Sequence, residues 1–297
     1  MRPIAKFRGT GVAIVTPFTQ SNAIDFPAFE TIIEHVINGG IDYIVLLGTT
    51  GESVTLSKQE KKALIDFTVK KIEKRVPLVI GIGGNNTSDV VLSIHGTPMK
   101  DVDAILSVCP YYNKPNQEGI YQHFKFISQA SPVPVILYTV PGRTSSNISA
   151  DTTLRLATDF DNIIGIKEAS ANFDQIHKVL KYRPDDFLVI SGDDGITLPL
   201  LASGADGVIS VVANVYPHEF SEMVRLGLKG DFENARKVHF LLFDFINALF
   251  ADGSPAGVKE ALMIRKLCHN FLRLPLVPVN KEIHLLLKQL ISQIEIS

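Results

Sequence analysis

The chain has 297 residues, of which 45% are hydrophobic and 20% are charged, and its formal net charge is -2. This length exceeds that of an average domain but is ordinary for an α/β barrel, and the apolar fraction is sufficient for a large core. Acidic and basic residues are nearly balanced and form no block of like charge. We therefore expect neither nucleic acid nor an anionic membrane as a partner.

The sequence shows no sign of export, membrane insertion or metal binding. The N-terminal residues lack the apolar run of a signal peptide, and no stretch of about 18 apolar residues could span a bilayer. The two cysteines, Cys109 and Cys268, stand in unlike contexts, so a disulfide framework is not expected and the cytoplasm is the default compartment. The histidines form no HxH or HxxxH pair, so we expect no metal site in the protein.

Short apolar runs alternate with amphipathic segments through the first 230 residues. Eight of the runs are typical of strands, at residues 11–15, 43–47, 78–82, 104–108, 135–138, 163–166, 188–191 and 207–211. Segments with helical period lie between them and start near residues 26, 57, 88, 117, 151, 173, 196 and 218. The second of these segments opens with Ser57 and Glu60, which is the pattern of a capping box.

Eight strand–helix repeats predict parallel strands with right-handed crossovers, and a closed (β/α)8 barrel fits their number and the chain length. An open doubly wound sheet is the alternative, but such a sheet usually carries a phosphate-binding loop. Residues 81–86 lack the third glycine of GxGxxG, and GxxxxGK[ST] does not occur. The barrel is therefore the prediction.

The pattern becomes entirely helical after Gly230, with helices expected at residues 231–250, 258–271 and 281–293. No candidate strand remains in this part of the chain. We therefore expect a catalytic barrel over residues 1–230 and a C-terminal helical region over residues 231–297 that packs on it.

The sixth apolar run leads directly into Lys167. Because alternate side chains of a strand share a face, Ile163, Gly165 and Lys167 should point one way, and Gly165 would leave room beside the lysine stem. Ile164 and Ile166 should point the other way. Apolar surroundings lower the pKa of a lysine, and a neutral lysine can form a Schiff base with a carbonyl. The alternative is a strand-end lysine that pairs with a carboxylate such as Glu168.

Polar residues gather where the predicted strands end, which is the end of a barrel that carries the chemistry. They are Gly48–Glu52 in the sequence GTTGE, residues 110–113, residues 138–144, Lys167, residues 192–194 and Ser210. The GTTGE turn suits a small carboxylate, because its backbone N–H groups and two hydroxyls are donors. Its alternative is an ordinary polar loop.

Two further side chains at these strand ends suit carbonyl chemistry. Tyr138 would follow the strand next to that of Lys167 and could pass protons, although it could equally be an aromatic plug in the barrel mouth. Arg143 follows a rigid Val-Pro-Gly turn, and its guanidinium group suits bidentate binding of a carboxylate. The alternative for Arg143 is a surface arginine.

Taken together, these motifs resemble those of the dihydrodipicolinate synthase family, within the N-acetylneuraminate lyase superfamily of pyruvate-dependent Schiff-base enzymes. The resemblance extends over nearly the whole chain, in matching order and spacing. The matching segments are residues 48–53, 110–113, 117–119, 138–144, 165–169, 191–194 and 207–211.

The resemblance implies a catalytic role for four residues. Lys167 would form the imine with pyruvate, and Tyr138 would be the proton donor and acceptor. Thr49 would link Tyr138 to a relay that Tyr112 completes from a neighbouring subunit. The family is typically a homotetramer of two tight dimers, and the resemblance implies no cofactor beyond the lysine.

The resemblance also implies the substrate contacts. Thr50 and the backbone around Ile209 would hold pyruvate, and Gly192 is a further substrate-binding position. Arg143 would bind the carboxylate of aspartate 4-semialdehyde. The implied reaction condenses these two substrates to 4-hydroxy-tetrahydrodipicolinate, on the route to diaminopimelate and lysine. The alternatives are another pyruvate aldolase of the superfamily, or a homologue without activity that binds pyruvate or lysine.

Some positions depart from the family pattern or concern its regulation. The departures are Thr139, Ser145, Ala171 and Ser254, where the family commonly has Asn, Gly, Gly and Asn. The positions that match the effector site for lysine in regulated members are Ser53, Asn85, Asp89 and Tyr111. Lys58 and Lys61 stand where such members commonly have histidine. Because a charged lysine would repel the effector's ammonium group, we expect weak or absent inhibition by L-lysine.

Overall fold

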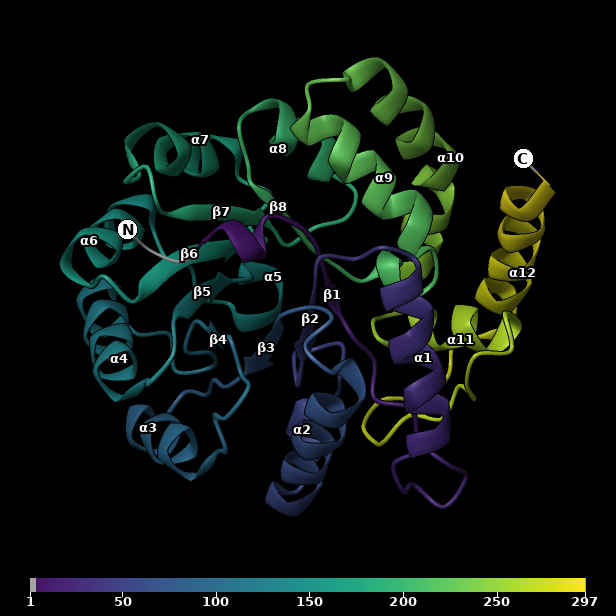
Figure 1. Ribbon diagram of the computed structural model, residues 1–297, viewed down its shortest axis with the longest axis horizontal. Helices are drawn as coiled ribbons and strands as arrows, with labels where there is room; N and C mark the ends of the chain where they lie inside the picture. The colour runs from purple at the N-terminus through teal and green to yellow at the C-terminus, as the bar shows by residue number, and fades with distance from the viewer. Residues whose placement is uncertain (1–3, 297) are drawn as a thin grey trace.

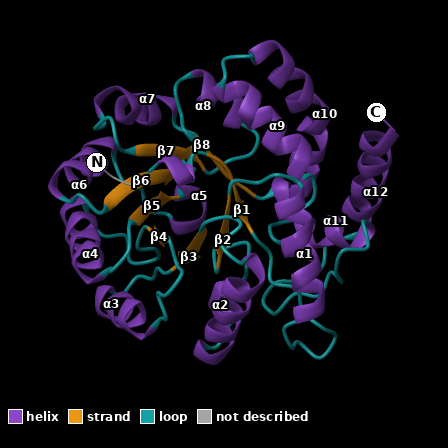
Figure 2. Ribbon diagram, viewed as in Figure 1, coloured by secondary structure: helices purple, strands orange, loops and turns teal. Residues whose placement is uncertain are grey.

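The computed structural model describes residues 4–296, which form a closed barrel of eight parallel strands surrounded by helices (Figures 1 and 2). The strands follow chain order, and the last pairs with the first. They are β1 (Gly9–Ala13), β2 (Tyr43–Leu46), β3 (Leu78–Gly81), β4 (Ala104–Val108), β5 (Val135–Thr139), β6 (Ile163–Glu168), β7 (Leu188–Ser191) and β8 (Gly207–Ser210). The predicted barrel is confirmed.

Helices surround the barrel and extend it on one side. Those in the barrel part are α1 (Phe26–Asn38), α2 (Lys58–Ile72), α3 (Thr87–Gly96), α4 (Gln117–Ala130), α5 (Pro141–Thr144), α6 (Ala150–Asp159), α7 (Phe173–Tyr182), α8 (Thr197–Ala202) and α9 (Pro217–Leu228). The C-terminal helices α10 (Phe232–Phe250), α11 (Ala256–Ile264) and α12 (Lys281–Ile296) gather beside α9 and α1 (Figure 1). Within residues 4–296, no helix is both long and apolar enough to cross a membrane.

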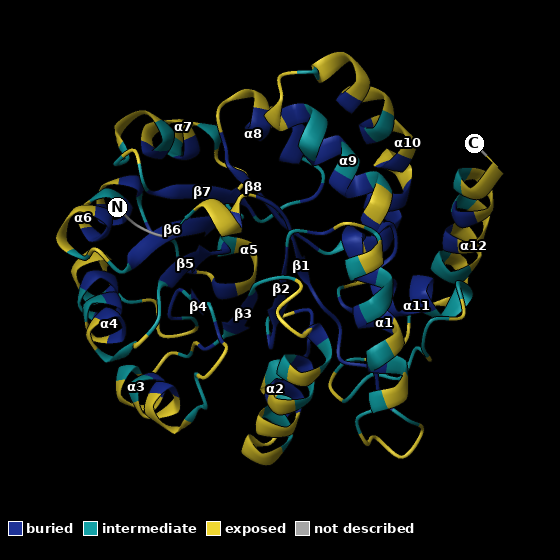
Figure 3. Cartoon of the chain, viewed as in Figure 1, coloured by how far each residue is buried: buried dark blue, intermediate teal, exposed yellow. Residues whose placement is uncertain are grey.

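The buried side chains form two clusters, one inside the barrel and one between the strands and the helices. Figure 3 shows buried strands, and surrounding helices that combine buried and exposed residues. The inner cluster includes Tyr43, Tyr138 and Leu188, and the outer cluster includes Phe29 of α1 and Phe220 of α9. Side-chain caps begin several of the helices that cover the strands. The predicted capping box of α2 is confirmed, because Ser57 and Glu60 bond to each other's backbone N–H groups.

The predicted alternation of side chains in β6 is wrong at two residues, Ile163 and Ile164. Ile166 packs in the outer cluster as expected, but Ile163 packs there too, and Ile164 packs inside the barrel. The pairing with β5 shifts here, since Ile163 pairs with Val135 whereas Gly165 pairs with the next residue, Ile136. Such a bulge inserts one extra residue into the strand, so the faces of the residues before and after it no longer follow simple alternation.

The second C-terminal helix ends well before the predicted residue 271. α11 stops at Ile264, and Lys266 takes the left-handed backbone conformation with φ 60°. The N–H groups of Lys266 and Leu267 bond back to the carbonyls of Met263 and Leu262, which closes the helix. The residues after this turn run across to the barrel instead of continuing the helix.

Candidate active site

Lys167 lies at the carboxyl end of β6, buried to 5% exposure. Its Nζ is 4.5 Å from the centroid of the Tyr138 ring, and Tyr138 is its pairing partner on β5. Burial lowers the pKa of Lys167 to about 8, an effect that the charge of Asp194 opposes and that of Arg143 assists. An amine with this pKa is in part neutral near pH 7, as nucleophilic attack on a carbonyl requires.

The alternative in which Lys167 pairs with Glu168 is not observed. The Glu168 carboxylate accepts hydrogen bonds from Ser170 N at 2.8 Å and from Gln175 Nε2 at 2.9 Å. Burial raises the pKa of Glu168. Among residues 4–296, no ion pair within 4.0 Å involves Lys167. The lysine is therefore buried without a bonded carboxylate.

The space beside the Lys167 stem comes from a different glycine than predicted. A Cβ atom at Gly165 would lie 2.7 Å from Cβ of Leu188, so that position is filled by the neighbouring strand. A Cβ atom at Gly192 would lie 3.0 Å from Cε of Lys167. Gly192 therefore makes the room, and a side chain there would displace the lysine.

Tyr138 and the turn after β2 meet beside this lysine. Tyr138 is 7% exposed and its side chain is hydrogen-bonded to that of Thr49. Burial raises the pKa of Tyr138, whereas Arg143 and the Thr49 bond act to lower it. The turn itself closes by hydrogen bonds from Gly51 N to Gly48 O and from Glu52 N to Thr49 O, both 3.1 Å long.

Arg143 lies on the short helix α5, which the sequence pattern did not predict. The helix begins at Pro141, and Arg143 N donates to Val140 O at 2.9 Å. The arginine is exposed, yet its charge reaches both Lys167 and Tyr138. It is therefore placed at the rim of the same mouth, where a cation can meet an anionic group of a substrate.

Thr139, which stands where the resemblance predicts asparagine, forms hydrogen bonds with the loop that follows α5. Thr139 Oγ1 donates to Asn147 Oδ1 at 3.0 Å and accepts from Ile148 N at 3.1 Å. Asn147 Nδ2 donates to Gln175 Oε1 at 2.7 Å, and Gln175 in turn reaches Glu168. This chain of bonds joins the loop that follows Arg143 to the strand that ends in Lys167.

Two other residues that differ from the expected family pattern, Ser145 and Ala171, have a left-handed backbone conformation. The φ angle is 55° at Ser145 and 56° at Ala171. The resemblance leads us to expect glycine at both positions, and glycine adopts this conformation without strain. Serine and alanine retain the backbone shape at a cost of roughly 1–2 kcal/mol each.

Asp194, one of the polar residues expected at the end of β7, is a buried carboxyl to which the sequence assigns no individual role. Its Oδ2 accepts from Val211 N at 3.0 Å and from Val212 N at 3.1 Å, which ties the end of β7 to the end of β8. Burial raises the pKa of Asp194 to about 6. Ile209, a predicted substrate contact, is buried in β8 within the inner cluster. Thr50 is likewise buried, in the turn after β2.

Tyr112 and Thr49 are the two predicted catalytic residues that the chain leaves exposed, whereas Lys167 and Tyr138 are buried. The Tyr112 side chain is 87% exposed, and its backbone is left-handed with φ 74°. Its N–H group lies 3.5 Å from Thr144 O, next to α5. The ring is therefore presented to the outside of the chain.

The predicted effector residues partly share one hollow. A hollow of about 180 Å³ lies by the start of α3, and three of its lining residues are Asn85, Asp89 and Tyr111. Asn85 Nδ2 donates to Tyr111 O at 3.3 Å. The fourth predicted residue, Ser53, does not line it.

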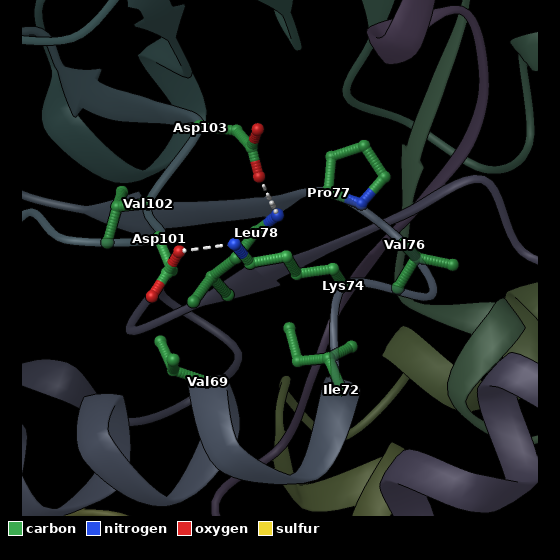
Figure 4. Close-up of a pocket in the computed structure, with 9 residues that line it drawn as sticks. All are labelled: Val69, Ile72, Lys74, Val76, Pro77, Leu78, Asp101, Val102 and Asp103. Carbon is green, nitrogen blue, oxygen red and sulfur yellow. Dashed lines mark hydrogen bonds and ion pairs between the residues drawn. The ribbon is translucent and has the colours of Figure 1, made fainter.

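A larger hollow, of about 270 Å³, lies at the opposite end of the barrel, where β3 and β4 begin (Figure 4). Its lining combines apolar residues of α2 with the ion pair of Lys74 and Asp101, 3.1 Å apart. Asp103 accepts from Leu78 N at 2.8 Å. Its polar groups are thus engaged with each other, and the predicted catalytic residues lie at the other end.

Comparison with known proteins gives concordant results. The sequence pattern of the Dihydrodipicolinate synthetase family matches residues 6–294. The 4-hydroxy-tetrahydrodipicolinate synthase of Flavobacterium psychrophilum is 53% identical over 93% of this chain and 94% of its own. A chloride-inhibited dihydrodipicolinate synthase of Acinetobacter baumannii, solved with pyruvate, is 37% identical, with a TM-score of 0.94 over 98% of this chain and 99% of that one. A monomeric dihydrodipicolinate synthase variant is also 37% identical, with a TM-score of 0.96 over 99% of both chains.

Proposed function

The chain belongs to the dihydrodipicolinate synthetase family, and on that premise we propose that its barrel mouth condenses pyruvate with L-aspartate 4-semialdehyde. The product is 4-hydroxy-tetrahydrodipicolinate, for which the related synthases are named, and it leads to diaminopimelate and lysine. One observation carries the proposal. The Lys167 amine is buried, is free of a bonded carboxylate and lies against the ring of Tyr138.

The first half of the reaction is imine formation. The neutral Lys167 amine attacks the ketone carbon of pyruvate, and the ketone oxygen leaves as water with protons that the site supplies. Tyr138 is the proton donor and acceptor in this step. Its raised pKa keeps the phenol protonated until it transfers its proton to the substrate. Thr49, hydrogen-bonded to Tyr138, passes the proton onward.

The second half makes the carbon–carbon bond. Loss of a methyl proton turns the imine into an enamine, whose terminal carbon attacks the aldehyde of the semialdehyde. The amino group of the acceptor then attacks the imine carbon, closes the ring and releases Lys167 as a free amine. Tyr138 serves both proton transfers, since it stands between the lysine and the Thr49 turn.

The substrate contacts follow the same geometry. Thr50, Gly192 and the backbone at Ile209 surround the pyruvate carboxylate and methyl group beside Lys167. Arg143 at the rim binds the carboxylate of the semialdehyde with two parallel hydrogen bonds. This assignment supports the semialdehyde over sugar-like acceptors, which carry hydroxyls at that end.

Assembly completes the site. The exposed Tyr112 ring inserts into the mouth of a neighbouring subunit and extends the Tyr138–Thr49 relay, in a homotetramer built from tight dimers. The catalytic unit is residues 1–230, supported by a helical region over residues 231–297. Both cysteines, Cys109 and Cys268, are free thiols, which suits the reducing cytoplasm.

The effector hollow is a vestige in this chain. Asn85, Asp89 and Tyr111 retain groups for the carboxylate and α-ammonium of lysine. Lys58 and Lys61 follow on the first turns of α2, and like charge there weakens the binding of an ε-ammonium. Inhibition by L-lysine is therefore weak or absent.

A panel of acceptors tests the proposed function. The purified chain is given pyruvate with aspartate 4-semialdehyde, with hydroxy-oxoglutarate-type acceptors or with sugar aldehydes, and the products are identified by mass spectrometry. The semialdehyde should be used with the highest kcat/KM. Preference for a sugar aldehyde would instead identify another pyruvate aldolase, and no turnover with any acceptor would indicate a binding protein.

A further inference from the structure

A buried ion pair that the reaction does not use lies beneath the substrate turn. Glu52 ends the GTTGE turn, and its Oε1 is 2.5 Å from Nζ of Lys259 on α11. Both side chains are 0% exposed. Removing two charges from water is costly, so such a pair is weak evidence for stability and calls for another role.

The backbone conformation of Glu52 is a second unfavourable feature at this position, in addition to its buried charge. Its φ angle is 52°, a left-handed conformation that glycine adopts without strain. Its N–H group donates to Thr49 O at 3.1 Å, and its own carbonyl accepts from Thr55 N and Thr55 Oγ1, both at 3.0 Å. A residue with a strained backbone and a buried charge therefore closes the turn, which indicates that the carboxylate itself is needed.

The partner side of the pair belongs to the C-terminal part of the chain. Lys259 Nζ also donates to Phe271 O at 2.9 Å and lies 4.2 Å from the centroid of the Phe18 ring. Arg273 N donates to the second oxygen, Oε2, of Glu52 at 3.1 Å. The early end of α11 at Ile264 lets the following segment reach the turn.

We propose that the Glu52–Lys259 ion pair positions the Thr49–Thr50 turn, so that the C-terminal helices set the rate of proton transfer and the binding of pyruvate in the barrel mouth. The inference rests on the proposed function of that mouth. Thr49 bonds to Tyr138 through its side chain and to Glu52 through its carbonyl. A shift of the Glu52 carboxylate therefore moves the turn that the proton relay uses. Glu52 and Lys259 are positioning residues and do not touch the substrate.

The test removes both charges together. Glu52→Gln with Lys259→Met keeps nearly the same side-chain volumes and leaves no charge buried alone. The matched control is Asp206→Asn with Arg183→Met, a buried pair at the opposite end of the barrel. Three quantities are measured for each: the melting temperature, kcat and KM for pyruvate, and the exchange of pyruvate methyl protons with D2O without an acceptor. The exchange reports imine formation and proton transfer alone.

The Glu52–Lys259 double variant should exchange pyruvate protons and turn over roughly tenfold to a hundredfold more slowly, because small misplacements of catalytic groups carry penalties of that size. The control should exchange at the wild-type rate whatever its melting temperature. Exchange within about twofold of wild type in the double variant would overturn the inference. Absence of exchange in the wild-type protein would overturn the proposed function instead.

A second variant covers failure of the double variant to fold. Glu52→Asp keeps both charges and withdraws the carboxylate from Lys259 by one methylene group. Slower exchange than in the wild type, with the fold retained by circular dichroism, supports the positioning role. Wild-type exchange in Glu52→Asp, or in any folded variant whose ion pair is broken, contradicts it.

Discussion

Two buried ionisable side chains at opposite ends of the barrel, Asp206 and Lys167, have different surroundings. At the amino ends of the strands, Asp206 accepts from Arg8 at 2.7 Å, from Val189 N at 2.9 Å and from Arg183. Asp42, at the same end, accepts from Thr10 N at 2.7 Å. At the carboxyl ends, Lys167 has no ion-pair partner among residues 4–296.

This difference separates stability from chemistry. A paired buried charge such as that of Asp206 has little freedom to change its protonation state, and it holds the neighbouring strands together instead. An incompletely paired buried charge keeps a shifted pKa, which proton transfer and nucleophilic attack require. Substitution of Asp206 should therefore lower the free energy of unfolding, and substitution of Lys167 should lower the rate.

The largest expected effect follows from replacing the lysine by a neutral side chain of similar shape. Lys167→Met should lower turnover by roughly a thousandfold or more, because a nucleophile cannot be replaced by binding alone. The free energy of unfolding should stay equal or rise, since the variant no longer buries an unpaired amine. Steady-state kinetics and urea unfolding measure the two quantities. Substantial turnover in Lys167→Met would remove Lys167 from the mechanism.

The reverse result is expected at the amino end. Asp206→Asn removes the carboxylate that Arg8 and Arg183 share, and because both arginines remain partly solvated the loss should cost about 1–3 kcal/mol in the free energy of unfolding. The kcat of the folded variant should remain within about twofold of wild type, because no group of the mouth is touched. A marked fall in kcat without a loss of stability would contradict the claim that Asp206 contributes to stability and not to catalysis.

An intermediate effect is expected for the acceptor contact. Arg143→Ala should lower kcat/KM for the semialdehyde about tenfold to a hundredfold, the effect of losing about 1.5–3 kcal/mol from a charge-assisted pair. Arg143→Lys should restore little of this, because an ammonium cannot make two parallel bonds. Trapping of the pyruvate imine should be nearly unchanged in both variants. Equal losses in trapping and in semialdehyde use would contradict this role.

The smallest expected effect is a shift along the pH axis. Imine formation needs the neutral amine, so its rate should rise with pH and level off above the Lys167 pKa of about 8. The negative charge of Asp194 opposes the lowering of that pKa, whereas the positive charge of Arg143 assists it. Asp194→Asn should therefore lower the pKa further and move the rising limb to lower pH. A limb that moves to higher pH would reverse the assigned sign.

Much of the fold and part of the site follow from local sequence patterns. The alternation of apolar runs with helical segments predicts the closed barrel, and the order of the strands then brings Tyr138 beside Lys167. These relations need only the regular geometry of strands and the rule that successive strands pair. The predicted partners Thr49 and Arg143 also lie at this end because their strands end there.

Other features depend on contacts that no local pattern contains. The bulge at Ile164 and the early end of α11 come from irregular backbone. Predictions from side-chain alternation and from helical period assume a regular backbone and therefore miss both features. Gly192 makes room for Lys167 only because β7 approaches β6 so closely. Glu52 and Lys259 are far apart in the chain and meet only after the barrel has closed.

Trapping of the imine tests the central claim most directly. The protein is incubated with pyruvate, reduced with borohydride and digested, and the modified peptide is identified by mass spectrometry. The competitor within the chain is Lys259, which is also buried and also has a pKa lowered by burial, but which is paired with Glu52. The account predicts a single adduct on Lys167 that is absent from Lys167→Met. An adduct on Lys259 or another lysine, or no adduct at all, would contradict it.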